Sequence, residues 1–135
     1  MAVIKALTQK EVKEFQRRGR QDHSEAMVIA KFFLPIAGHY WYLTELDTDP
    51  TSEEYGIGFG FANLNDPQCA ELGYIDLFEL LQLNRHRKLD RSVDQLTDIK
   101  IGGPEACIGV VERDIHWSPR PVSEIIEKVK SSGWA

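Results

Sequence analysis

Two apolar segments decide the fold: KFFLP at residues 31–35 and WYLTE at residues 41–45, separated by a turn that contains Gly38. Residues 27–33 are apolar almost without interruption and a proline follows, which predicts a strand buried on both sides. Residues 39–46 predict a second strand with aromatic side chains on both faces. The short connection between them favours antiparallel pairing.

A third strand is predicted at residues 55–61, after an acidic, turn-forming segment at residues 47–54. Within it, the run GIGFG at residues 56–60 leaves one face without side chains. A glycine face marks the close approach of a helix, another backbone or a ligand. A pocket is therefore expected beside this face, where the second strand presents Trp41 and Glu45 on one shared face.

Helices are predicted near both ends and in the middle of the chain. The capping box TQKE at residues 8–11 begins a helix that ends near Gly19. Asp76 caps a second helix, which ends near Arg85. The segment at residues 119–121 leads into a last helix. The apolar stripe of this helix is Val122, Ile125, Ile126 and Val129.

Two further strands are predicted, at residues 71–75 and 108–117. Together the elements indicate an α+β fold, a mainly antiparallel sheet of four to five strands with helices packed on one face and at the termini. We expect the 135 residues to form a single domain. In it, residues 1–25 supply the N-terminal helix and linker, and residues 84–107 form a loop insertion.

Composition sets bounds on function. The 21 acidic and 16 basic side chains give a net charge of −5, which is too mild to identify a partner. Cys69 and Cys107 belong to no CxxC or Cys/His cluster, so we expect reduced, buried thiols and neither a zinc site nor a disulfide framework. The N-terminus lacks the apolar region of a signal peptide and no window suits a membrane span, so we expect a cytoplasmic protein.

One candidate site lies on the predicted last strand, where acidic and imidazole groups share a face at a spacing of two residues. The candidate groups are Glu112, Asp114 and His116, with Glu45 or His39 completing the set. Such a set could hold zinc, manganese or iron, or serve an acid/base hydrolase in which Arg113 holds an anion. A solvated or ion-paired strand face is the simpler interpretation, so we assign neither metal nor cofactor.

A second candidate is the acidic run around the predicted hairpin loop. It comprises Glu45, Asp47, Asp49, Glu53 and Glu54. The run is no EF-hand, because Ser52 stands where the sixth position requires glycine and Gly58 stands where the twelfth requires glutamate. A polar hairpin loop and a patch that faces a basic partner both remain, and the patch needs further acidic side chains from elsewhere on the surface.

Two short basic clusters are candidates for nucleic-acid contact. They are Arg17, Arg18 and Arg20, and Arg85, Arg87 and Lys88. Because no aromatic motif accompanies them and the chain is acidic, cations at helix ends, where they suit the helix dipole, are the preferred interpretation. The sequence also contains no GxSxG elbow or phosphate-binding glycine loop, so it indicates no nucleophile.

Several short motifs, in chain order, resemble those of one family. They are Lys31-Phe32-Phe33 with Pro35, Trp41-Tyr42 with Thr44-Glu45, Gly58-Phe59-Gly60, Glu71-Leu72-Gly73-Tyr74, Glu112-Arg113-Asp114, and Pro119 with Pro121-Val122-Ser123-Glu124. On these residues, which extend over about three quarters of the chain, the protein resembles the family called domain of unknown function 2958. Residues 1–25 match poorly and residues 84–107 exceed the family's usual connection, so no function seated there transfers.

The resemblance implies no activity, cofactor or catalytic residue. The family occurs mostly in bacteria, among plasmid, integrative-element and phage genes, which implies an accessory role in mobile elements, countering host defence or assisting transfer. Its pattern favours an aromatic residue where this chain has His116, which argues against a metal ligand there.

The leading hypothesis is a small non-enzymatic protein that binds a macromolecule, preferably a protein. The expected binding residues are Trp41, Tyr42, Glu45 and Arg113, although most of the strand aromatics should be core. The alternatives are the metal-dependent or acid/base hydrolase and the nucleic-acid-binding protein described above. Oligomeric state is not fixed by the sequence.

Overall fold

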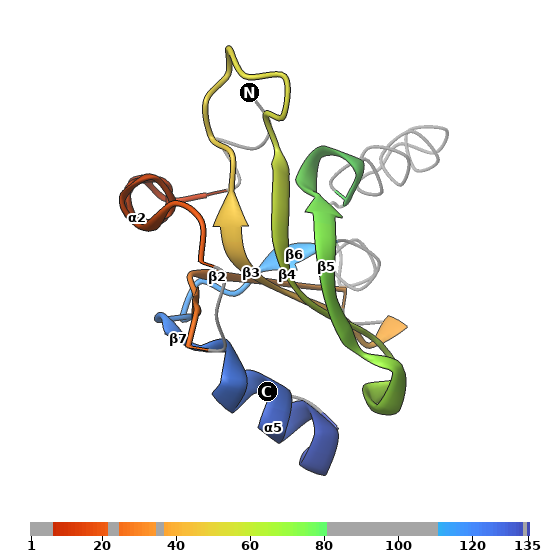
Figure 1. Cartoon of the computed structure of the whole chain (residues 1–135). Coiled ribbons are helices and arrows are strands. Elements are labelled where there is room, and N and C mark those ends of the chain that lie inside the picture. The colour runs from red at the N-terminus through yellow and green to blue at the C-terminus, as the bar shows by residue number, and fades with distance from the viewer. Residues whose placement is uncertain (1–6, 22–24, 35–36, 81–110, 134) are drawn as a thin grey trace, which may run out of the picture.

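The computed structural model describes residues 7–21, 25–34, 37–80, 111–133 and 135 (Figure 1). Within them the main sheet has five strands in the order β5-β4-β3-β2-β6, and every neighbouring pair is antiparallel. The strands are β2 (Ala30–Leu34), β3 (His39–Leu46), β4 (Ile57–Leu64), β5 (Glu71–Asp76) and β6 (Glu112–Arg113). A separate ladder pairs β1 (Met27–Val28) with β7 (Arg120–Pro121). The α+β class and the antiparallel sheet are confirmed.

The two longer helices lie near the termini, as expected, but on different faces of the sheet, whereas we expected the helices that pack on it to share one face. Helices α2 (Gln9–Arg18) and α5 (Val122–Ser132) lie on different sides of the strands (Figure 1). A short 3-10 helix, η2 (Pro67–Cys69), precedes β5. Residues 77–80 are also helical, and the Asp76 carboxylate accepts the Glu79 N–H at 3.2 Å, as the predicted cap requires.

Alternate residues of β3 enter two separate hydrophobic clusters. Trp41 and Leu43 face α2, and Tyr42 between them faces α5. The α2-side cluster contains Leu7, Phe15, Ile29, Ala30, Phe32, Trp41, Leu43, Leu46, Ile75, Leu77, Leu80 and Val111. The α5-side cluster contains Ala26, Val28, Tyr42, Phe61, Ala70, Val122, Ile125 and Val129. The central strands are thus buried on both faces, as their apolar sequence predicted.

The helix ends follow from their capping residues. The Thr8 hydroxyl accepts the Glu11 N–H at 3.1 Å and Glu11 Oε1 accepts the Thr8 N–H at 3.0 Å, so the predicted capping box is confirmed. Helix α5 ends at Gly133, whose φ of 98° lies in the left-handed region that favours glycine. The predicted apolar stripe of α5 is buried or half-buried against the sheet.

Two predicted strands are shorter than expected. The first is interrupted at Ile29, which separates β1 from β2. The last, expected over residues 108–117, is a strand only at Glu112–Arg113, and residues 108–110 lie outside the described residues. Asp114 ends the strand because its side chain accepts the His116 N–H at 2.9 Å and its carbonyl accepts the Trp117 N–H at 3.2 Å, which makes a turn.

A β-bulge at Thr44 changes the faces of β3. The register with β4 shifts between Leu43 and Glu45, so one extra residue stands on the β3 side. After the shift Leu46 packs in the same cluster as Leu43, and Glu45 turns to the α5 side. The expectation that Trp41 and Glu45 share a face is therefore wrong, because it assumed a regular strand.

The glycine face of β4 is closed by the neighbouring strand. A Cβ at Gly58 would overlap the Glu45 carbonyl oxygen, and a Cβ at Gly60 would overlap the Tyr42 carbonyl oxygen. These glycines allow close approach of the β3 backbone, which is one of the three meanings we attached to them. The groove described below is lined by Ile57, Gly58 and Phe59 of β4.

Candidate functional site

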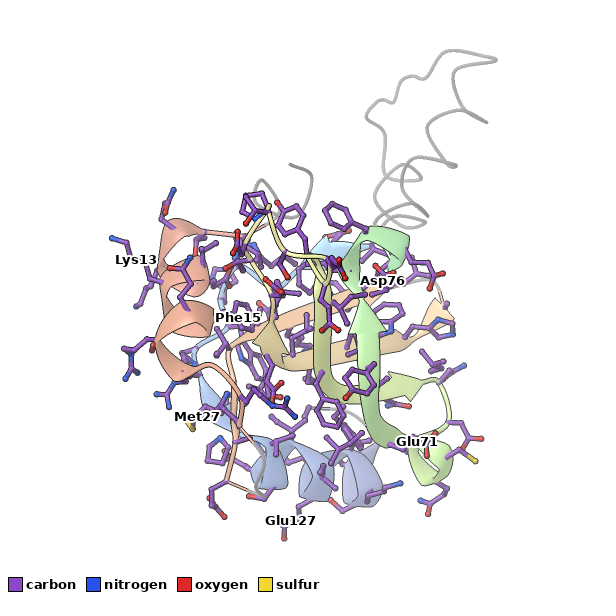
Figure 2. The ribbon with its side chains drawn as sticks, turned by 45° about the horizontal axis from the view of Figure 1, so that its top comes forward. Lys13, Phe15, Met27, Glu71, Asp76 and Glu127 are labelled. Carbon is purple, nitrogen blue, oxygen red and sulfur yellow. The ribbon has the colours of Figure 1, made fainter. Side chains whose placement is uncertain are left out.

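A groove of about 950 Å³ opens on the α5 side of the sheet. Strands β3, β4 and β5 form its floor. Its walls are α5, the segment between α2 and β1, and the loop between β3 and β4. Figure 2 shows Glu71 and Asp76 at opposite ends of β5, which bounds the groove, and Glu127 on α5. The size is at the upper end of the range for small-molecule pockets, about 300–1,000 Å³.

The floor of the groove is apolar and exposed toward β5. Tyr74 is 80% exposed and Leu72 is 46% exposed, both on the groove side of β5. The Tyr74 ring meets Phe59 of β4 edge-to-face, with ring centroids 5.4 Å apart and an interplanar angle of 80°. Ile57 and Ile126 continue the apolar lining. Exposed apolar side chains that are contiguous mark interaction sites on soluble proteins.

The rim of the groove is acidic. Glu45 and Asp47 at the end of β3, Glu54 in the following loop and Glu127 on α5 all line it, against the single cation Arg20 among its described lining residues. Glu127 supplies the acidic side chain from elsewhere that the patch facing a basic partner needed. The loop itself is well ordered by its own hydrogen bonds, since Asp49 accepts both the N–H and the hydroxyl of Thr51, which lowers the pKa of the Asp49 carboxyl.

Gln21 fixes the wall between α2 and β1. Its buried amide donates to the Thr44 carbonyl at 2.6 Å and to the Met27 carbonyl at 3.2 Å, and it accepts the Met27 N–H at 2.9 Å. The Gln21 N–H donates to Glu45 Oε2 at 2.7 Å. Glu45 is half-buried, and this hydrogen bond holds its carboxylate in place at the inner end of the rim.

Trp41 and Tyr42, two of the expected binding residues, are core residues. Trp41 is 8% exposed and Tyr42 is completely buried, between Phe61 and Trp117. Burial raises the pKa of the Tyr42 hydroxyl to about 12. The expectation that these rings form a docking surface is corrected, because both faces of β3 are covered. Of the expected set, only Glu45 reaches the groove.

Lys31 lies in a cage of aromatic rings beside β2. Its Nζ is within 5.3–6.0 Å of the ring centroids of Phe33, Tyr40, Tyr42 and Trp117. The amine also donates to the Ala135 carbonyl at 2.7 Å and lies 3.9 Å from Asp114 Oδ2. Burial lowers the pKa of Lys31, and the Asp114 carboxylate opposes that shift. The cage ties β2 to the C-terminal residue and stabilises a buried cation.

The candidate hydrolase residues are dispersed. Glu45 lies at the groove, whereas Glu112 lies on β6 at the far edge of the sheet and His116 is an exposed turn residue. Asp114 approaches Lys31, as described above. Among the described residues, no three His, Cys, Asp or Glu side chains gather closely enough to hold a metal ion.

The remaining predicted cations also have separate positions. Arg113 pairs with Glu11 of α2 at 3.3 Å, an interaction that joins β6 to the first helix. Arg17 and Arg18 both approach Glu14 on their own helix, at 2.8 Å and 3.9 Å. Arg20 lines the groove. Arg85, Arg87 and Lys88 lie outside the described residues, so their proposed cluster is not placed.

Cys69 is a free, exposed thiol, which corrects the expectation of burial. It ends η2, a surface turn, and hydrogen bonding to the Asp66 side chain raises the pKa of its thiol. Cys107 lies outside the described residues. In the part of the chain that the structure describes, no helix is long and apolar enough to cross a membrane.

The fold and the groove define a class: an α+β protein with an antiparallel sheet and an acidic, apolar-floored groove. Residues 3–100 match the model of a family described as protein of unknown function (DUF2958). The chain belongs to this family, as its motifs indicated. The match includes the N-terminal residues left out of the motif comparison, and Glu112-Arg113-Asp114 lies beyond its end. No curated protein and no solved structure matches the chain.

Sequence reasoning missed the two exposed side chains of the groove floor. Leu72 and Tyr74 alternate on one side of a correctly predicted strand, but the sequence did not show that this strand is an edge strand. It also missed Glu127 and Ile126 as groove residues, because their position depends on how α5 crosses the sheet. The acidic run at residues 45–54 and the glycine run at residues 56–60 were the two signals that pointed to this place.

Proposed function

We propose that this protein binds another protein, and that the groove receives a segment of that partner which carries both apolar and basic side chains. The observation that carries the proposal is the combination of an exposed apolar floor with an acidic rim. Burying Leu72 and Tyr74 would supply binding free energy of about 25 cal/mol per Å² of apolar surface. The rim carboxylates would select a basic segment and repel acidic ones.

The same rim disfavours nucleic acid at this place. Glu45, Asp47, Glu54 and Glu127 would face phosphates of the same sign, and Arg17 is already paired with Glu14. A role as an accessory protein of a mobile genetic element or phage, acting on host defence, fits a binding protein. That wider role is proposed because the family resemblance implies an origin among plasmid, integrative-element and phage genes. The groove supports only the proposal that the protein binds a partner.

A random peptide library displayed on phage tests the proposal. It is selected on the wild-type protein and counter-selected on Tyr74→Lys, which removes the floor ring and adds a repelling charge. Because Tyr74 is 80% exposed, the variant should keep its stability, which a thermal melt checks. We expect the retained peptides to be enriched in Lys or Arg among apolar residues. Retained acidic peptides, or none that distinguish the two proteins, would contradict the proposal.

A matched pair on α5 tests the rim. Glu127 lines the groove and Glu124, one turn earlier, does not. Glu127→Gln removes one rim charge and should weaken the binding of a retained basic peptide by about 0.2–1 kcal/mol, the usual contribution of an exposed ion pair. Glu124→Gln should leave the affinity unchanged. Equal effects of both substitutions would assign the attraction to overall charge and not to the rim.

A further inference from the structure

The outer edge of β5 is unpaired in the part of the chain that the structure describes. Strand β5 ends the sheet order, and its partner β4 occupies one side only. The Leu77 N–H donates to the Gly56 carbonyl at 2.9 Å, one residue beyond the pair Ile57–Asp76. Hydrogen-bonded pairs alternate along an antiparallel ladder, so Gly73 and Ile75 turn their backbone groups toward β4. The backbone groups of Leu72 and Tyr74 therefore point to the open edge.

This edge carries only part of the usual protection against strand pairing, namely the acidic residues Glu71 and Asp76 at its ends. Its six residues contain no proline and no lysine, and its register with β4 is regular, without a bulge. Its exposed side chains, Leu72 and Tyr74, belong to the groove floor. A Cβ at Gly73 would meet no atom within 4 Å, so nothing crowds the middle of the strand. The edge and the groove are thus one continuous surface.

We infer that the partner segment binds in an extended conformation and pairs with β5 as an added strand. The inference deepens the proposed function and rests on it. Alternate side chains of the added strand would cover Leu72 and Tyr74 and extend toward the acidic rim, while its backbone satisfies the outward N–H and C=O groups of those residues. The partner is a heterologous protein segment with apolar residues for the floor and Lys or Arg for the rim.

A second copy of this chain fits the edge poorly. The β5 strand of a second copy would bring Glu71 and Asp76, at its two ends, and no basic side chain to the acidic rim. Each chain also carries a net charge of −5, which adds long-range repulsion. A basic segment would meet the same two ends with complementary charge.

Peptide N-methylation tests the mode of binding. The probe is a basic peptide retained in the phage selection, synthesised with N-methyl groups on every second residue in either of two phases. An added strand turns alternate N–H groups toward β5, so one phase should lower the affinity at least about tenfold and the other should leave it nearly unchanged. Equal effects of both phases would overturn strand addition while the groove proposal stands. A selection that retains no such peptide would overturn both.

Two readouts on the protein complete the test. Leu72→Pro removes an outward N–H and leaves the hydrogen bonds between β5 and β4 intact. It should lower the affinity for the peptide at least about tenfold relative to Leu72→Ala. In the wild type, peptide binding should slow amide hydrogen exchange at Leu72 and Tyr74 but not at Gly73 and Ile75, which are already bonded. Unchanged exchange at Leu72 and Tyr74 would overturn the inference. So would dimers of the peptide-free protein that Leu72→Pro dissociates.

Discussion

On the α5 side of the sheet, a strand tyrosine is buried in one region and exposed in another. Tyr42 of β3 is completely buried beneath α5 and Trp117, whereas Tyr74 of β5 keeps 80% of its surface exposed. Both are strand tyrosines with an aromatic neighbour on β4, Phe61 for the first and Phe59 for the second. The difference teaches that the placement of α5, and not residue type, decides which ring is core and which is available to a partner.

The largest expected effect tests this contrast directly. Tyr42→Ala should lower the free energy of unfolding by about 3–5 kcal/mol, because it removes a buried ring and leaves a cavity. Tyr74→Ala should change it by less than about 0.5 kcal/mol, as is usual for an exposed site. Urea unfolding of both variants measures the pair. Similar losses for the two would show that Tyr74 is also part of the core.

A glycine pair extends the same contrast to the backbone. Gly60→Ala would drive a Cβ into the Tyr42 carbonyl oxygen and should destabilise the protein by about 1–3 kcal/mol or more, since the β3 backbone must move. Gly73→Ala meets open space and should be neutral or stabilising by up to about 1 kcal/mol, through the unfolded state. Thermal melts of both variants suffice. A stable Gly60→Ala would contradict the close approach of the two strands.

The buried amine of Lys31 should make the free energy of unfolding depend on pH. Because burial lowers the pKa of Lys31 in the folded protein, unfolding takes up a proton between that lowered value and the ordinary value of 10.5. The free energy of unfolding should therefore rise with pH across this window. Lys31→Met should lack the rise, with wild type and variant compared below pH 10.0, the ordinary pKa of the Tyr42 hydroxyl. Parallel pH profiles would indicate that Lys31 is solvated.

The smallest expected effect concerns substitutions at Leu72, on the open edge of β5, in the protein without a bound peptide. Leu72→Ala and Leu72→Pro should each unfold cooperatively with wild-type-like secondary structure, because the Leu72 N–H points away from β4. Circular dichroism during urea unfolding measures this, and Gly73→Pro is the control that should lose more stability, since its N–H belongs to the ladder. If Leu72→Pro unfolds the sheet as readily as Gly73→Pro, the assignment of the open edge is incorrect.

The sequence by itself determined most of the helices and strands. The capping box at residues 8–11, the apolar stripe of α5, strand β3 at residues 39–46 and the antiparallel connections all appear where local patterns placed them. Such patterns report interactions between residues close in the chain, which is why they could be read without a structure. The acidic run at residues 45–54 was recognised in the same way.

Tertiary structure alone decided the site. The bulge at Thr44 moved Glu45 to the α5 side, and the position of α5 buried Tyr42 while leaving Tyr74 and the rim exposed. Glu127 lines the same groove as the acidic run, although the two are far apart in the sequence. Strand β5 is an edge because β6 pairs with β2 at the other side of the sheet. These features depend on the order of strands and the crossing of a helix, and such long-range packing leaves no periodic signal in the chain.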